Sequence, residues 1–217
     1  MRIVFLGPPG IGKGTQAALL AKRRGLTHTS TGTIIRAAIE AETPLGEEAK
    51  KYVQEGHLVP DRLVRVLAET AIAERDYDQF VLDGYPRTIV QAEWLSEFLE
   101  THGAPLDSAI NLEVPTDVIV DRLSKRRVHR ITGENFHLDF KPPPADVDPG
   151  LILQRTDDRP EYIRKRLEVY RKETRPVEEY YETRGILRNV EGVGDVEDVY
   201  SRIEEVLPAT TVEKKPS

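Results

Sequence analysis

Gly7-Pro8-Pro9-Gly10-Ile11-Gly12-Lys13-Gly14-Thr15 is the stretch of this 217-residue sequence that decides its fold class. A short apolar segment at residues 3–6 precedes it, and a helix-like stretch at residues 15–24 follows it. A buried strand, a glycine-rich loop and a helix start in this order form a cradle for phosphate. The glycines let backbone N–H groups turn toward one anion, and the helix N-terminus adds partial positive charge there. We therefore predict a phosphate site at residues 7–15.

Within this stretch, Lys13 supplies a mobile cation for the outer phosphates of a ligand. The spacing from Gly7 to Gly12 and Lys13 fits the P-loop, whose next residue is usually Ser or Thr. Gly14 stands there instead, and the hydroxyl comes one residue later, at Thr15. The strand and helix on either side disfavour a chance glycine-rich turn, because that context is what confirms the motif.

Composition excludes several classes of protein. The chain has 39% hydrophobic residues, a formal net charge of -6 and no cysteine. The acidic balance disfavours a protein that coats nucleic acid, and the lack of cysteine excludes disulfides and thiolate metal sites. No apolar run approaches membrane-spanning length, and the first strand follows no charged leader. We expect a cytoplasmic protein with no nucleic-acid or membrane partner, and a frayed tail at residues 208–217.

Short apolar runs alternate with helix-like stretches along the chain. Strands are predicted at residues 3–6, 80–82, 109–112 and 186–190. Helices are predicted at residues 15–24, 61–75, 90–101, 116–127, 160–183 and 195–207. This alternation predicts an α/β fold of three layers, with a central parallel sheet and helices on both faces.

Two of these helices carry finer signals. Asp61 and Asp195 each follow a turn residue at a predicted helix start, so both are candidate N-caps. The helix at 160–183 has a stripe at helical spacing that we expect to pack in the core. Its members are Ile163, Leu167, Tyr170, Thr174, Val177 and Tyr181.

Two segments interrupt the alternation. Residues 30–59 are helical in pattern, whereas residues 128–158 are rich in proline and glycine and have few helix signals. A structureless loop of that length inside a compact domain is usually a lid or a binding loop. Asp83 follows the strand at 80–82, so it lies at the carboxyl end of that strand, where ligands bind in open α/β sheets. Its carboxylate suits a network of magnesium-bound water.

Arginines are the second large signal. Phosphoryl transfer needs positioning and positive charge over the oxygens in flight, and Arg binds phosphate bidentately while remaining ionised. Each arginine alone is more often a solvated helix charge. Beside a P-loop, we favour the functional interpretation for Arg36, Arg87, Arg126, Arg155 and Arg166. Arg122 and Arg126 are four residues apart on one predicted helix face.

Several motifs in one order closely resemble the adenylate kinase family over nearly the whole chain. They are the P-loop, Ser30-Thr31-Gly32, Asp83-Gly84-Tyr85-Pro86-Arg87-Thr88, Gln91, residues 122–127 and Arg155-Thr156-Asp157-Asp158-Arg159. The resemblance implies a single P-loop kinase domain, residues 1–217, with a mobile AMP-binding lobe at 30–59 and a mobile lid at 128–158. The length of the lid is similar to the long-lid form found in bacterial enzymes.

The resemblance also implies a reaction and its site. The reaction is ATP + AMP ⇌ 2 ADP with Mg²⁺, in a monomer. The implied ATP site comprises Gly10, Ile11, Gly12, Lys13, Gly14, Thr15, Arg122, Arg126, Phe136 and Gly194. The implied AMP site comprises Thr31, Gly32, Arg36, Val59, Gly84, Arg87, Gln91, Arg155 and Arg166. The implied catalytic residues are Lys13, Arg36, Arg87, Arg126, Arg155, Arg166, Asp157 and Asp158, with Asp83 beside magnesium-bound water.

The sequence departs from the family pattern at several positions. Thr33 stands where many relatives carry Asp, and His57 where many carry Lys, and both positions flank the implied AMP site. Where some relatives hold lid zinc with cysteines, this chain has His129, Thr132, Ala145 and Asp148. This is a poor zinc site, so we expect no zinc. We expect a hydrogen bond across the lid instead, from His129 or Thr132 to Asp148.

Three alternatives stay open at this stage. The nearest is a UMP or CMP kinase, although the pairing of Thr31 with Gln91 resembles enzymes that act on AMP. Another P-loop kinase for a small molecule would not need the pattern around Asp83 and Gln91. A non-catalytic nucleotide-binding regulator would bind ATP yet tolerate loss of Arg126 and Arg166.

Overall fold

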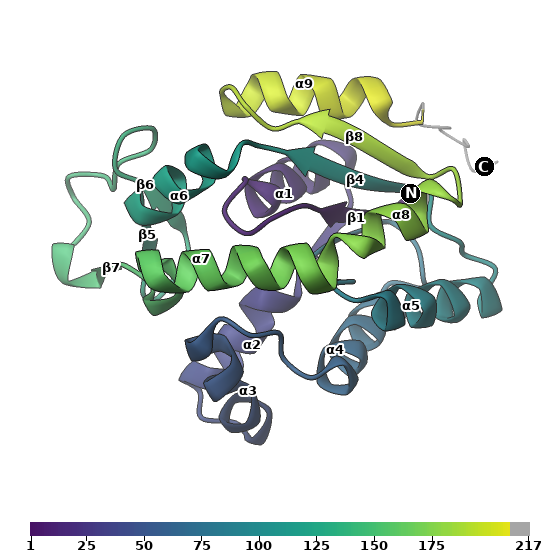
Figure 1. The fold of residues 1–217 in the computed structure, drawn as a ribbon, viewed down its shortest axis with the longest axis horizontal. Helices are drawn as coiled ribbons and strands as arrows, with labels where there is room; N and C mark the ends of the chain where they lie inside the picture. Colours follow the sequence, from purple (N-terminus) through teal and green to yellow (C-terminus); the bar gives the residue numbers. More distant parts are fainter. Residues whose placement is uncertain (209–217) are drawn as a thin grey trace, which may run out of the picture.

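A computed structural model describes residues 1–208 of the chain, with a five-stranded sheet at its centre (Figure 1). The order across the sheet is β2 (Thr27–Ser30), β3 (Phe80–Asp83), β1 (Arg2–Leu6), β4 (Ser108–Glu113) and β8 (Leu187–Glu191). All neighbouring pairs are parallel. A parallel sheet buried on both faces requires nearly continuous apolar strands, which is why the runs in β1, β3 and β4 were visible in the sequence. The predicted α/β class is confirmed.

The edge strand β2 is one that the sequence analysis missed. Its residues are Thr27-His28-Thr29-Ser30, and within the described part of the chain it pairs with β3 alone. Threonine is a good strand former, but an edge strand that is only partly buried needs no apolar run. Only Thr29 of this strand is buried, so no hydrophobic pattern marks it.

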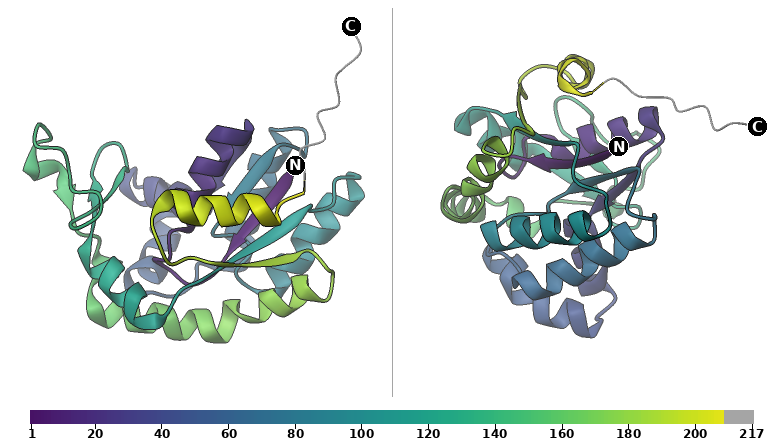
Figure 2. Two further views of the ribbon diagram at one scale, coloured as in Figure 1. Left: turned by 90° about the horizontal axis from the view of Figure 1, so that it is seen from above. Right: turned by 90° about the vertical axis from the view of Figure 1, so that its right-hand side faces the viewer.

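Helices cover both faces of the sheet, and β1 contributes alternate side chains to the two cores (Figure 2). Ile3 and Phe5 belong to the cluster that includes α1 (Lys13–Arg24) and α9 (Val196–Val206). Val4 and Leu6 belong to the cluster that includes α4 (Asp61–Ala73) and α5 (Ile89–Thr101). The first cluster also takes residues from α6 (Thr116–Lys125) and α7 (Pro160–Val169).

The helix ends test the predicted caps. Asp195 is the N-cap of α9, and its side chain accepts a hydrogen bond from the Asp198 N–H at 2.9 Å. The prediction for Asp61 is wrong, because Pro60 is the N-cap and Asp61 is the first residue of α4. Helix α6 ends two residues earlier than predicted, because the chain turns into a strand at Arg126. Arg126 therefore does not share a helix face with Arg122.

The long helix expected at 160–183 is divided into three parts. A π-helical turn, η3 (Tyr170–Thr174), separates α7 from α8 (Pro176–Glu182). Pro176 has no N–H to donate to the preceding turn, and its ring crowds the carbonyl there, so the regular hydrogen-bond pattern cannot continue through it. The predicted core stripe is nevertheless buried throughout, from Ile163 to Tyr181.

Two small substructures extend from this body (Figure 1). Residues 30–59 contain the helices α2 (Thr31–Glu40) and α3 (Pro44–Glu55), which pack on each other. The lid segment forms a three-stranded antiparallel sheet, β6-β5-β7, from β5 (Arg126–His129), β6 (Asn135–His137) and β7 (Ile152–Leu153). These strands have two to four residues, too few to show a period of two in the sequence. Short 3₁₀ turns, η1 (Pro149–Leu151) and η2 (Thr156–Asp158), complete the segment.

The predicted side-chain bond across the lid is wrong. His129 Nδ1 accepts from the Thr132 N–H at 3.1 Å, and Thr132 Oγ1 accepts from the Glu134 N–H at 3.3 Å. Asp148 accepts from the Gly150 N–H at 2.8 Å. Each of these groups thus satisfies a backbone donor of its own turn, and the β5–β6 and β5–β7 ladders join the lid instead. In residues 1–208, no group of three or more His, Cys, Asp or Glu side chains is arranged to hold a metal.

Two further expectations concern membrane-spanning segments and the C-terminal tail. Within the described part of the chain, no helix is both long and apolar enough to cross a membrane. Residues 209–217, nearly all of the tail predicted to fray, lie outside the described residues.

The contact between α2 and α3 generates a prediction. An added Cβ on Gly46 would overlap the carbonyl of Ala38, so Gly46→Ala must push the two helices apart. We expect the free energy of unfolding to fall by about 1–3 kcal/mol, the usual cost of overpacking. Chemical denaturation measures it, with Lys51→Ala on the exposed face of α3 as the control. Equal stability of Gly46→Ala and wild type would contradict the close packing of the two helices.

Candidate active site

A cavity of about 1160 Å³ opens at the carboxyl ends of the parallel strands. The P-loop forms one wall, α2 and the Gly56–Val59 turn form another, and residues of β5, β6 and α7 complete it. In open α/β sheets, ligands bind at this edge because the connecting loops and helix N-termini converge there. The cavity is the candidate active site.

The P-loop connects β1 to α1 as the sequence predicts. Gly10 and Gly12 have φ of 84° and 101°, a region that residues with a Cβ rarely adopt. The side chain of Lys13 turns back over the loop, and its Nζ donates to the carbonyls of Gly7 and Pro8 at 2.7 Å each. A Cβ on Gly14 would lie 3.1 Å from Asp83 Oδ2. The glycine at this unusual position therefore allows the Asp83 carboxylate to approach the start of α1.

Burial makes Lys13 an unusual lysine. Desolvation lowers the pKa of Lys13 to about 7, and the nearby charges of Arg87, Arg166 and Arg126 act in the same direction. Asp83 opposes them and favours the charged form. A phosphate anion would add much more negative charge beside Nζ, so the ammonium form is the one suited to hold nucleotide.

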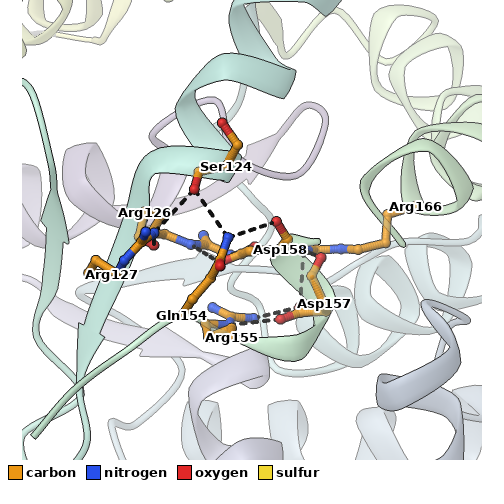
Figure 3. A network of polar contacts seen from close by, with 8 residues as sticks. All are labelled: Ser124, Arg126, Arg127, Gln154, Arg155, Asp157, Asp158 and Arg166. Carbon is orange, nitrogen blue, oxygen red and sulfur yellow. Dashed lines mark hydrogen bonds and ion pairs between the residues drawn. The ribbon is translucent and has the colours of Figure 1, made fainter. Parts of the chain in front are cut away.

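Two adjacent aspartates fix three arginines at the base of the lid (Figure 3). Asp158 is fully buried and forms a two-point ion pair with Arg126, while Asp157 binds Arg155 through both oxygens at 2.8 and 3.0 Å. Arg166 Nη1 lies 3.0 Å from Asp157 Oδ2 and 3.4 Å from Asp158 Oδ1. Burial alone would raise the pKa of Asp157, but Arg166 and Arg155 outweigh it and hold this pKa below its ordinary value.

A second set of contacts joins the two ends of the lid segment. Gln154 Nε2 donates to the carbonyl of Ser124, the last turn of α6, at 3.1 Å and lies 3.4 Å from the carbonyl of Asp158 (Figure 3). Arg127 Nη1 donates to the same Ser124 carbonyl at 3.1 Å. The start of β5 and the segment after β7 are therefore tied to each other beside the buried ion pairs.

The arginines on the α2 side of the cavity are held differently. Arg36 Nη2 donates to Thr33 Oγ1 at 3.2 Å, and Arg87 Nε donates to the Gly84 carbonyl at 2.8 Å. Within residues 1–208, neither guanidinium forms an ion pair with a carboxylate. Desolvation lowers the pKa of both, to about 9 for Arg36. Two half-buried cations with neutral acceptors form a strong site for an anion.

Gln91 lies beside these arginines in the first turn of α5 and is 1% exposed. Its Oε1 accepts from the Arg87 N–H at 2.7 Å, and its Nε2 donates to Asp61 Oδ1 at 2.7 Å. Thr88 caps α5 by accepting from the Gln91 N–H, and its hydroxyl lies 3.2 Å from Asp61 Oδ2. Asp61 is a residue that the sequence analysis saw only as a helix start.

On the P-loop side, Arg122 Nη1 lies 3.2 Å from the Gly192 carbonyl and 3.5 Å from that of Ile11. Phe136 is buried in the lid sheet, with Lys141 Nζ 5.3 Å from its ring centre. His137, Phe140 and Lys141 also line the cavity and were missed by the sequence analysis. Lying in and after a three-residue strand, they showed no motif that could have marked them.

The predicted site residues come together almost completely. Every predicted member of the ATP and AMP sites lines the cavity, as do Asp83 and Asp157. Asp158 is the exception among the predicted residues, because it lies behind the wall with 0% exposure. For magnesium, the oxygen donors at hand are the Asp83 carboxylate and the hydroxyls of Thr15 and Ser30, and Ser30 Oγ lies 3.4 Å from Asp83 Oδ2. Oxygen donors suit Mg²⁺, which keeps several water ligands in such sites.

A P-loop on one side of a cavity, an arginine pair on the other and three further arginines between them define a phosphotransferase with two phosphate-bearing substrates. The family model described as "Adenylate kinase" matches residues 5–186. The chain is 58% identical over 209 residues to the adenylate kinase of Salinibacter ruber, covering 96% of this chain and 99% of that protein. It is 44% identical to that of Bacillus subtilis over 212 residues, covering 95% and 98%. The chain belongs to the adenylate kinase family.

Membership confirms the predicted resemblance and makes the chain an enzyme, a nucleoside monophosphate kinase. The alternative of a non-catalytic regulator is thereby disfavoured, as is an unrelated P-loop kinase for a small molecule.

The lowered pKa of Lys13 predicts a proton uptake on ATP binding. At pH 8, above its pKa of about 7, Lys13 is mostly neutral, and a bound phosphate raises this pKa because opposite charge favours the ammonium form. Binding should therefore take up a proton at pH 8 and progressively less as the pH falls below 7. Calorimetry in two buffers with different ionisation enthalpies measures the uptake. Lys13→Met should abolish it, and an uptake that is zero in wild type or unchanged in the variant would contradict the assignment.

Proposed function

We propose that this cavity carries out ATP + AMP ⇌ 2 ADP, with ATP on the P-loop and AMP between α2 and α5. The observation that carries the proposal is that cations with neutral partners lie on two separate walls of the cavity. Lys13 donates to P-loop carbonyls on one wall, and on the other, within residues 1–208, Arg36 and Arg87 donate to a hydroxyl and a carbonyl and form no ion pair with a carboxylate. Two separated sites for anions in one cavity suit a donor and an acceptor that both carry phosphate.

On the donor side, the N–H groups of residues 10–15 and the ammonium of Lys13 would hold the phosphates of ATP. Arg122 and the loop at Gly194 lie beside the P-loop and would contact the base, with Phe136 covering it from the lid. Bound Mg²⁺ would neutralise charge on the phosphates, with Asp83 accepting from its water ligands.

On the acceptor side, Arg36 and Arg87 would bind the phosphate of AMP, and Thr31, Gly32, Val59, Gly84 and Gln91 would enclose its nucleoside. An AMP phosphate oxygen then attacks the γ-phosphorus of ATP as the bond to the β–γ bridging oxygen breaks, so the β-phosphate leaves with its electron pair. Negative charge spreads over the three oxygens of the phosphoryl group in transfer. Arg126, Arg155 and Arg166 would stabilise that charge, with Asp157 and Asp158 holding these guanidinium groups in position.

Water competes with AMP for the phosphoryl group, so the site must exclude it during transfer. We infer that residues 30–59 and 128–158 move as two lobes over a static sheet and close the cavity. Each lobe carries or adjoins arginines of the cavity, and each lies outside the strand–helix alternation of the body. All the groups named here come from one chain, which supports a monomer. Its substrates are nucleotides of the cytoplasm, where we propose that it acts.

A substrate panel tests the reaction. With Mg²⁺ and ATP as donor, we expect rapid ADP formation with AMP and little with UMP, CMP or GMP. Lys13→Ala and Arg87→Ala should each lower kcat by about 10³-fold, because a charge clamp on a transferring phosphoryl is worth at least this much. Arg164→Ala, an exposed arginine on α7, is the control and should leave kcat unchanged. A preference of wild type for UMP or CMP would refute the assignment of the acceptor.

Hydrogen exchange tests the moving lobes. An analogue that joins two adenosines through a phosphate chain should raise protection in residues 30–59 and 128–158 and change little in β1, β3 and β4. Thermal unfolding with and without the analogue serves as the control for global stabilisation. Unchanged exchange in 128–158 would count against a lid.

A further inference from the structure

The amide of Gln91 is fixed by two partners with opposite hydrogen-bonding character. The Arg87 N–H, a donor, contacts Oε1, and the Asp61 carboxylate, an acceptor, contacts Nε2, both at 2.7 Å. Gln91 is almost fully buried, so few other partners are available to it. Rotating the amide by half a turn would place oxygen against carboxylate and N–H against N–H. Both contacts would then be lost, so the amide has one allowed orientation.

The fixed amide still has one N–H and one oxygen lone pair for a ligand. Gln91 lines the cavity next to Arg87, where the acceptor nucleotide is proposed to lie. Adenine presents an amino donor at C6 and an acceptor at the adjacent N1, so an oxygen and an N–H in this order match it. Guanine and hypoxanthine present an oxygen at C6 and an N–H donor at N1, which is the reverse order. They would require the amide orientation that Asp61 and the Arg87 N–H exclude.

Asp61 fixes the orientation of the Gln91 amide from outside the cavity wall. It is the first residue of α4 and half-buried, and its second oxygen lies 3.2 Å from the Thr88 hydroxyl. Thr88 is itself the N-cap of α5 and holds the Gln91 N–H. Asp61 therefore reaches the ligand only through Gln91, which makes it a positioning residue.

We propose that Asp61 selects the acceptor base: by fixing the Gln91 amide, it makes the site accept a 6-aminopurine nucleotide and reject a 6-oxopurine nucleotide. The inference rests on the proposed function, because it needs the nucleoside monophosphate to lie beside Gln91. It goes further by assigning discrimination between two purines to a residue that does not touch the base. A site built to hydrogen-bond one pattern rejects the reversed pattern because its buried polar groups would lose their partners.

The experiment compares kcat/KM for AMP and for IMP in wild type, Asp61→Ala and Asp61→Asn. IMP differs from AMP at C6 and N1 alone, without the extra amino group of GMP. In Asp61→Ala the AMP-to-IMP ratio of kcat/KM should fall about tenfold, the factor expected from one hydrogen bond to a charged group. Asp61→Asn keeps an acceptor oxygen but can also donate, so its ratio should lie between the other two. The KM for ATP should stay at its wild-type value.

Glu47→Ala is the matched control, since Glu47 is an acidic residue in the first turn of α3 and does not line the cavity. Glu47→Ala should leave the AMP-to-IMP ratio of kcat/KM unchanged, even if Glu47→Ala and Asp61→Ala both lower the stability of the protein. If Asp61→Ala does not fold, the Asn variant decides alone. Equal losses for AMP and IMP in the folded variants would mean that Asp61 has only a structural role. A wild type that fails with AMP would instead refute the proposed function and leave this inference without its premise.

Discussion

The structure depends on holding Lys13 and five arginines, all half-buried, around one cavity. Like charges that line one cavity repel each other, and burial removes water that would screen them. The chain answers with two adjacent carboxylates, Asp157 and Asp158, each of which binds more than one guanidinium group. Arg36, Arg87 and Lys13 are held by hydroxyl and carbonyl oxygens instead. Cations with neutral partners remain available for an anion, whereas paired cations are already positioned.

This division follows the architecture. The paired arginines lie where the lid segment joins the body, on β5, just before η2 and on α7, and the Ser124–Gln154 contact ties the two ends of that segment together. Arg36 and Arg87, which form no ion pair within residues 1–208, lie on α2 and after β3, beside the carboxyl edge of the sheet. Replacing Asp158 would leave the half-buried Arg126 without its carboxylate partner, which is costly even though the ion pair itself adds little net stability. The aspartates therefore serve geometry more than stability.

Strong local signals in the sequence were sufficient to predict the central strands of the sheet and the phosphate-binding loop. Burial on both faces of the sheet requires apolar strands, and positive φ in the loop favours glycine. Both requirements can therefore be recognised from the residue types. The polar edge strand β2 and the lid strands leave none, because partial exposure removes the alternation that marks a strand. Pro176 did mark the break between α7 and α8, but the continuous stripe from Ile163 to Tyr181 masked it. The contacts of Asp61 and the hydrogen bonds of the lid could not be predicted, because they depend on which side-chain and backbone donors the fold brings near, and sequence spacing does not encode this.

Arg126 and Arg155 occupy the two ends of the lid segment, whereas Ile131, 75% exposed, lies at one of its turns. A rotation about the ends of a segment displaces the atoms near those ends least and the far turns most. Under the proposed lid motion, Arg126 and Arg155 would stand near the pivot, and the outer turns would set the length of the lever. Changes in the outer turns would alter the speed of this motion and leave these guanidinium groups in place. The rate of closure and the geometry of the phosphate site would then depend on different parts of the lid segment.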